Sequence, residues 1–215
     1  FARIFMLLLF LTVWELFADF HIIDSFFFSS PSRVVACFVR MVSERSLFTH
    51  IGITLTETVI SFFLVALVSL SAATLLWYSR RLSEILEPFL VVLNSLPKSA
   101  LAPLLIVWLG TGMDTIIAAG ISVAIFGAII NLYTGFLQAD PEKLLLIRTL
   151  GGTRRDCFFK IVLPASIPVI LSNMKVNIGL SLVGVVIGEF LAARRGLGYL
   201  IIYGSQVLQL DMLIT

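Results

Sequence analysis

Two long runs without a charged side chain constrain this sequence more than any other feature. Residues 58–78 and 115–137 contain no Asp, Glu, Lys or Arg, and each is long enough to cross the roughly 30 Å hydrocarbon layer of a membrane as a helix. Backbone groups in lipid must be satisfied within the segment, so helices are the expected form. Because 59% of the 215 residues are hydrophobic and 13% are charged, a body of this size could not bury its apolar surface in water. The sequence therefore predicts an all-α, polytopic transmembrane helical bundle.

Three further spans are less regular than these two. They are expected at residues 4–20, 85–109 and 161–188. The second of them should be a broken helix, because Pro97 and its neighbouring prolines interrupt it. A sixth span is expected to start near Asp211 and to be truncated, so residues 1–215 are predicted to form a single transmembrane domain with five visible spans.

The distribution of Lys and Arg between the connecting segments indicates the orientation. Placing the amino end in the cytoplasm puts eight of these residues inside and five outside, which agrees with the positive-inside rule. In this orientation residues 21–50 form an outer loop with an interfacial helix at 33–42, and residues 140–163 are cytoplasmic. His21 and His50 fall in the outer loop and are expected to be solvated.

The cytoplasmic segment 140–163 has clear helix punctuation. Asp140 is a good N-cap before a proline, and Gly151 and Gly152 suit the end of that first helix. Thr153 followed three residues later by Asp156 can cap a second short helix. Two helices joined by a Gly-Gly bend would make a rigid knob on which a soluble motor could push. The alternative is a pair of amphipathic helices lying on anionic lipid.

This segment resembles the "EAA" signature of permease subunits of binding-protein-dependent ABC importers. Gly151 is followed, after nine residues, by Ile161, Leu163 and Pro164, as in the second half of that signature. The first half departs from it, since residues 145–147 are Leu-Leu-Ile in place of Glu-Ala-Ala.

The resemblance extends to other parts of the chain. Residues 96–110, Glu189 and residues 196–201 look like the nitrate, sulfonate and taurine branch of this family, whereas Glu57 stands where a basic residue is expected. The resemblance implies a type I ABC importer permease fold in a bacterial inner membrane. It also implies two copies of an ABC ATPase, a second permease copy forming a homodimer, and an extracytoplasmic solute-binding protein. Neither a cofactor nor a metal is implied, and the net charge of +2 gives no reason to expect a nucleic-acid partner.

The chain contains no Walker A sequence, so it is not expected to hydrolyse ATP itself. By resemblance, the cytoplasmic segment would sit in a groove of a separate ATPase and transmit its closure as a rigid-body movement. The residues expected to provide this coupling are Leu144, Leu145, Ile147, Arg148, Leu150, Gly151, Arg154, Arg155, Asp156, Ile161, Leu163 and Pro164.

A second group of polar and proline residues is expected along the translocation path. The group consists of Asn94, Pro97, Lys98, Asn131, Asn177 and Glu189. Lys98 could attract or gate an anionic solute, or it could extend to the inner interface. The asparagines could contact a solute or bond helix to helix, and Glu189 could be an outer-end contact or gate element.

The expected solute is a small organic or inorganic anion such as a sulfonate, taurine or nitrate, with a thiamin-precursor pyrimidine as the alternative. Two other classes of function compete with an ABC permease. A transporter or channel driven by ion gradients predicts an internal repeat, and the two halves of the sequence show none. A membrane enzyme would need an acid–base pair within the spans, and the sequence supplies none.

Overall fold

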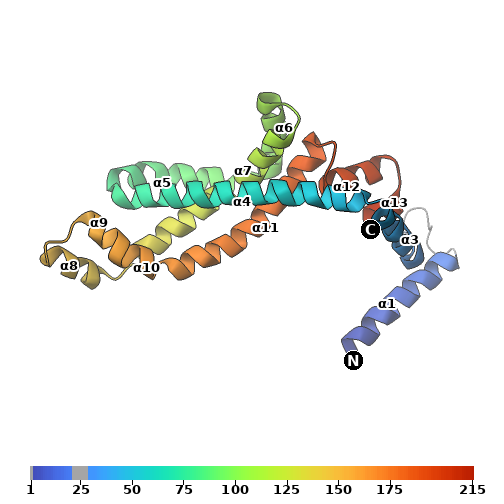
Figure 1. The fold of residues 1–215 in the computed structure, drawn as a ribbon, viewed down its shortest axis with the longest axis horizontal. Coiled ribbons are helices and arrows are strands. Elements are labelled where there is room, and N and C mark those ends of the chain that lie inside the picture. Colours follow the sequence, from blue (N-terminus) through green and yellow to red (C-terminus); the bar gives the residue numbers. More distant parts are fainter. Residues whose placement is uncertain (1, 21–28) are drawn as a thin grey trace.

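The computed structural model describes residues 2–20 and 29–215, and every regular element in that part of the chain is a helix (Figure 1). Within these residues, three helices are long and apolar enough to cross a membrane: α4 (Ser46–Tyr78), α7 (Met113–Leu137) and α11 (Ile167–Ala192). A fourth span arises if the pair α5 (Arg80–Ser95) and α6 (Lys98–Leu109) is counted as one. The two helices of this pair are bent by 98° at the predicted break. The predicted all-α, polytopic fold is confirmed.

Two spans begin at residues other than the predicted ones. Helix α4 starts at Ser46, well before the charge-free run, because Glu57 is only 4% exposed and is tolerated inside the helix. Helix α11 starts at Ile167, later than the predicted residue 161, since Pro168 fits its first turn, where a missing N–H costs no hydrogen bond. A short π-helix, η1 (Phe158–Val162), and α10 (Leu163–Ala165) precede it.

The predicted outer loop 21–50 is largely helical in its described part. Helix α3 (Pro31–Ser43) lies where the interfacial helix is predicted, and its position at the interface remains a prediction. Residues 46–50 belong to α4, so the loop ends earlier than predicted. The Ser30 side chain caps α3 by accepting from the Arg33 N–H. Residues 21–28, which include His21, lie outside the described residues.

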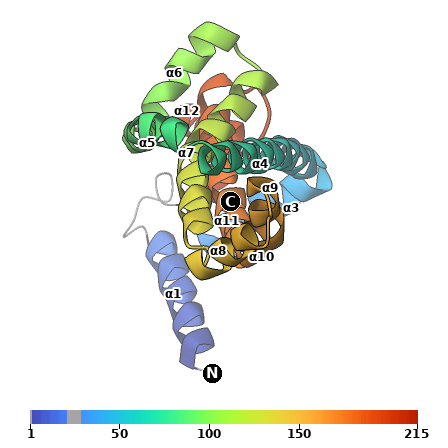
Figure 2. The ribbon, with the colours of Figure 1, turned by 90° about the vertical axis from the view of Figure 1, so that its left-hand side faces the viewer.

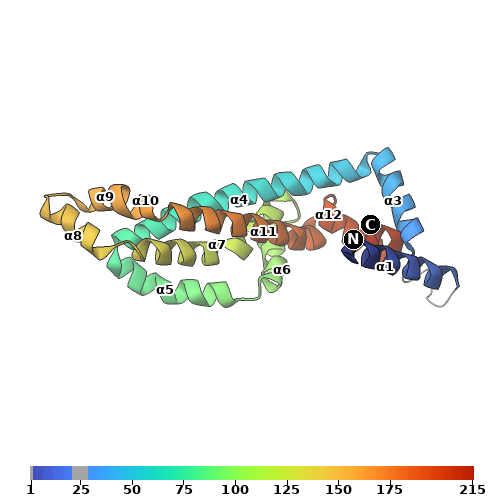
Figure 3. The same cartoon turned by 90° about the horizontal axis from the view of Figure 1, so that it is seen from below.

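The predicted first span corresponds to helix α1 (Ala2–Asp19). It carries three charged residues, and it is not among the helices that pass as membrane spans on length and apolarity. In Figures 1 and 3 it lies apart from the bundle and beside α3. Its Glu15 carboxylate accepts hydrogen bonds from the N–H and hydroxyl of Ser32, at 3.0 and 2.6 Å.

Small residues bring α4, α7 and α11 together in the centre of the bundle. A Cβ added at Gly120 of α7 would lie 2.6 Å from the Ser61 hydroxyl of α4 and 2.9 Å from Val185 of α11. A Cβ at Gly184 of α11 would lie 2.8 Å from the backbone of α7. Close approach through small residues is the usual basis of helix association in membranes, so these three helices form the rigid part of the fold.

Other helices occupy the two ends of this bundle. Helices α8 (Pro141–Thr149) and α9 (Arg154–Cys157) lie at one end, which Figure 2 views along the bundle. At the opposite end, α12 (Leu197–Gln206) follows the end of α11 (Figure 3), and α13 (Leu210–Ile214) packs against α3. A 3.3 Å ion pair between Asp211 of α13 and Arg33 of α3 joins these two helices. Helix α13 stands where the truncated sixth span is predicted, and that span remains a prediction.

Candidate functional site

Residues 140–163, between α7 and α11, form a compact helical unit at one end of the bundle, and this unit is called the lever below. The Asp140 carboxylate accepts from the Glu142 N–H at 2.9 Å and begins α8, as predicted. The chain then reverses at Gly151, whose φ of +82° lies in the left-handed region. The Gly152 N–H donates to the Ile147 carbonyl at 2.9 Å, and a Cβ at Gly152 would overlap Ile147. This fixes the angle between α8 and the following helical segment.

The second part of the lever has the predicted capping box. The Thr153 side chain accepts from the Asp156 N–H at 3.2 Å, and the Asp156 carboxylate accepts from the Thr153 N–H at 2.9 Å. Lys160 lies 2.8 Å from the same carboxylate. The hydrogen bonds from Lys160 and Thr153 hold the pKa of Asp156 well below its usual range. Helix α9 continues into η1 and α10, so residues 154–165 form one continuous helical segment.

Phe158 fastens this segment to the membrane helices. Its side chain is 2% exposed and belongs to a core cluster with Leu132 and Phe136 of α7. Its ring centroid lies 5.2 Å from that of Trp77 and 5.4 Å from that of Tyr78, at the end of α4. The lever and the ends of α4 and α7 therefore share one packed core.

Some apolar side chains of the predicted coupling segment are exposed, and others pack inward. Leu145 and Leu150 are 62% and 76% exposed, so they are available to a partner. Leu144 packs against the core cluster around Phe158, and Ile147 lies against the glycine bend. Leu146, which is not among the predicted coupling residues, is 58% exposed beside Leu145.

The charged residues of the segment also differ in what they contact. The Arg154 guanidinium donates to the Trp77 carbonyl at 3.1 Å and lies 5.5 Å from the Trp77 ring centroid. It is directed toward α4 and not toward the tip of the lever. Arg155 lies over the Phe159 ring at 5.7 Å. Arg148 is exposed at the end of α8.

The remaining coupling residues lie where the lever meets α11. Leu163 packs against the core cluster and Ile161 is half-buried. Pro164 is exposed and takes a first-turn position of α10.

The six predicted path residues are not brought together into one site. Pro97 forms the break between α5 and α6, and the adjacent Lys98 ammonium donates to the Leu93 carbonyl and lies 5.1 Å from the Phe126 ring centroid. Helix α5 alone extends over 16 residues from Arg80 to Ser95, a length of about 24 Å, before the break that precedes Lys98. Lys98 is thus well removed from the end of the bundle that carries the lever.

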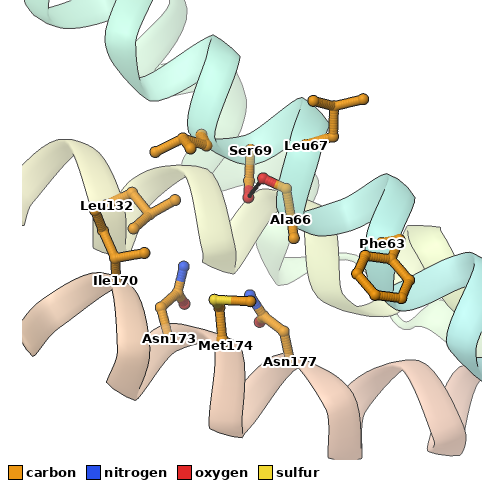
Figure 4. Close-up of a pocket in the computed structure, with 10 residues that line it drawn as sticks. Phe63, Ala66, Leu67, Ser69, Leu132, Ile170, Asn173, Met174 and Asn177 are labelled. Atoms are coloured by element: carbon orange, nitrogen blue, oxygen red, sulfur yellow. Dashed lines mark hydrogen bonds between the residues drawn. The ribbon is translucent and has the colours of Figure 1, made fainter. Parts of the chain in front are cut away.

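The three asparagines predicted to line the path do not share one cavity. Asn131 lines a cavity of about 310 Å³ with Ser172 and Asn173, and Asn94 is exposed on α5. Asn177 lines a separate, mainly apolar cavity of about 250 Å³ between α4 and α11, shown in Figure 4. The Asn173 amide donates to the Ala128 carbonyl at 3.2 Å, which is the helix-to-helix use that the sequence left open.

Glu189 is fully buried at the end of the bundle opposite the lever. Its carboxylate accepts from the Thr54 hydroxyl and from the Gly198 N–H, each at 2.6 Å. Gly196, with φ of +115°, allows the backbone to pass directly over this carboxylate, where a Cβ would overlap it. Glu57, the unexpected acid, is buried one turn further along α4 than Thr54, and its Oε2 atom has no hydrogen-bond partner among the described residues.

His50 is half-buried beside this carboxylate and contacts Gly196, whereas it was expected to be solvated. Its Nδ1 lies 2.9 Å from the Gly196 nitrogen, and its ring stacks on Tyr199 with a centroid separation of 6.2 Å. The sequence did not reveal this because the contact joins residues far apart in the chain. Among the described residues, no group of three or more His, Cys, Asp or Glu side chains could hold a metal ion.

Comparison with known proteins places these features in a family. Residues 65–215 match the model of the "Binding-protein-dependent transport system inner membrane component" family. The chain is 30% identical over 203 residues to the "Probable ABC transporter permease protein" of Haemophilus influenzae, covering 94% of this chain and 82% of the relative. It is 28% identical to the formylaminopyrimidine transport permease protein ThiX of Halalkalibacterium halodurans, over 89% of this chain and 76% of the relative.

Two further similarities concern a branch of the family and its fold. The chain is 24% identical to the taurine transport system permease protein TauC of Escherichia coli, over 95% of this chain and 76% of the relative. An inward-facing structure of the MetNI methionine ABC transporter has a chain with the same fold, at a TM-score of 0.67 and 17% identity. This match covers 80% of the present chain and 88% of the MetNI chain.

Proposed function

The chain belongs to the family of binding-protein-dependent transport system inner membrane components, and we propose that residues 140–163 are the lever through which a separate ATPase drives it. It is a multi-pass permease subunit of an ABC importer for small solutes, in the nitrate, sulfonate and taurine branch, and is not an enzyme. Its partners are an ATPase and a solute-binding protein. Membership of this family excludes the two rival classes of function, a gradient-driven transporter and a membrane enzyme.

One observation carries the proposed coupling: an exposed apolar tip on a firmly anchored segment. Leu145, Leu146 and Leu150 are each more than half exposed, whereas Phe158 of the same segment is buried among aromatic rings of α4 and α7. Exposed apolar groups on a protruding element are typical of a protein–protein contact. The tip would bind the ATPase, and the buried root would transmit its movement.

We propose that two copies of this chain enclose the path. Asn94 and Asn131 are exposed on helices that lie in the membrane, and exposed amides at membrane depth need a polar partner or water. A second copy facing these residues would provide one wall of an aqueous path, with two ATPases below. In this arrangement Lys98, Asn94 and Asn131 would line the path, whereas Glu189 would hold the outer end of the bundle together.

An anionic solute is the first candidate for the cargo. Lys98 is a cation at membrane depth beside the α5–α6 break, where it would raise the local concentration of an anion. A formylaminopyrimidine, as named for ThiX, is the second candidate because that relative matches 89% of this chain. Binding of taurine, alkyl sulfonates, nitrate and formylaminopyrimidine to the cognate solute-binding protein would decide between the two classes.

The coupling proposal is tested by Gly151→Val. A β-branched residue is strongly disfavoured at a φ of +82°, so the variant should lose ATP-driven uptake while inserting normally and keeping its helix content. Gly52→Val is the matched control, because Gly52 lies in α4 and a Cβ there meets no atom within 4 Å. Normal uptake by the Gly151 variant would contradict the coupling role.

A further inference from the structure

Three arginines from three different elements line one cavity at the lever end of the bundle. Arg80 comes from the start of α5, Arg148 from the end of α8 and Arg154 from the start of α9, and the cavity has a volume of about 330 Å³. No carboxylate is among the residues lining it. The other lining residues are Leu76, Trp77, Ser83, Tyr133, Leu137 and Leu144.

The positive charge of this cavity is only partly compensated. Arg80 pairs with Glu84 at 2.9 Å, but both side chains are largely exposed. Arg154 is held by a backbone carbonyl and an aromatic ring, neither of which neutralises a guanidinium. In the part of the chain that the structure describes, Arg148 has no ion-pair partner. The cavity therefore offers several N–H donors of fixed geometry to an anion, and guanidinium groups favour phosphate for this reason.

The position of the cavity indicates where the anion comes from. Trp77 and Tyr78 end α4, and Tyr133 lies in the last turns of α7; aromatic residues with a polar edge are enriched at this membrane–water boundary. Leu137, also in the lining, is 59% exposed. The cavity thus has cationic and apolar walls at headgroup depth, which fits a phosphate joined to an acyl chain better than a free phosphate.

We propose that this cavity binds the phosphate headgroup of an anionic phospholipid. The bound headgroup would bridge Arg148 of α8 to Arg80 of α5 and Arg154 of α9, and so would brace the lever against the membrane helices. This proposal goes beyond the permease function and assigns the inward-directed Arg154 a ligand other than the ATPase.

Lipid retention by the protein, purified both alone and in complex with its ATPase, tests the proposal. Native mass spectrometry would count lipids bound after extraction from phosphatidylcholine vesicles with and without phosphatidylglycerol. Arg148→Gln removes one charged donor and breaks no side-chain hydrogen bond or ion pair within the described residues. Phosphatidylglycerol affinity should therefore fall about tenfold, with helix content unchanged. Arg81→Gln is the matched control, because Arg81 is exposed at the same boundary but does not line the cavity.

Four outcomes would overturn the proposal. Wild-type phosphatidylglycerol binding by the Arg148 variant would show that the cavity is not the site, and an equal loss in the Arg81 variant would show a diffuse electrostatic effect. Displacement of the lipid by millimolar inorganic phosphate would identify a free-anion site. Complete release of the lipid when the ATPase binds would show that the arginines serve the protein contact. None of these outcomes bears on whether the chain is a permease.

Discussion

Truncation of Phe158 should weaken the joint between the lever and the membrane helices. The side chain is 2% exposed, and its ring lies 5.2 to 5.6 Å, between centroids, from the rings of Trp77, Tyr78 and Phe136. A buried Phe→Ala substitution costs about 3–5 kcal/mol. For a chain of this length each kcal/mol lowers Tm by about 2–4 °C, so the expected decrease is on the order of 10 °C.

The functional consequence follows from the position of the cavity that Phe158→Ala would create. A loosened joint would absorb the movement of the ATPase, so we expect less solute imported per ATP hydrolysed while the ATPase still binds. Thermal unfolding of purified protein and uptake into proteoliposomes measure the two effects. Phe158→Leu retains most of the volume and should lie between the wild type and the Ala variant.

Phe159→Ala is the control for this prediction. The neighbouring ring is 53% exposed and contacts Phe158 and Arg155, so its removal should lower Tm by only a few degrees. An unchanged Tm in Phe158→Ala, or an equal decrease in both variants, would refute the reasoning that the buried ring anchors the lever.

Two further predictions concern the membrane-embedded part. Lys98→Ala should lower the maximal uptake of an anionic solute by about tenfold, since the cation raises local anion concentration; unchanged proteoliposome uptake would remove Lys98 from the path. Gly196→Ala would place a Cβ against the Glu189 carboxylate at a positive φ and should cost about 1–3 kcal/mol, measured as a lower Tm. Gly179→Ala, where a Cβ meets no described atom within 4 Å, should leave Tm unchanged or slightly higher, because alanine favours a helix over glycine. A decrease equal to that of Gly196→Ala would contradict the close-packing argument.

Features governed by near neighbours in the chain could be predicted from the sequence. The charge-free runs identified α7 and most of α4, because lipid requires each crossing segment to satisfy its own backbone. The caps at Asp140 and Thr153 were also predictable, since their hydrogen bonds join residues two or three positions apart. The broken span followed from Pro97, because a proline restricts its own φ and the preceding residue.

The sequence by itself thus determined the class of fold, the main helices and the shape of the lever. The tertiary structure alone decided which side chains meet: Thr54 with Glu189, His50 with Gly196, and Arg154 with Trp77. These partners are separated by 77 to 146 residues, so no local periodicity relates them. Their meeting depends on the angles and separations at which the helices pack, which the small residues of α4, α7 and α11 set collectively.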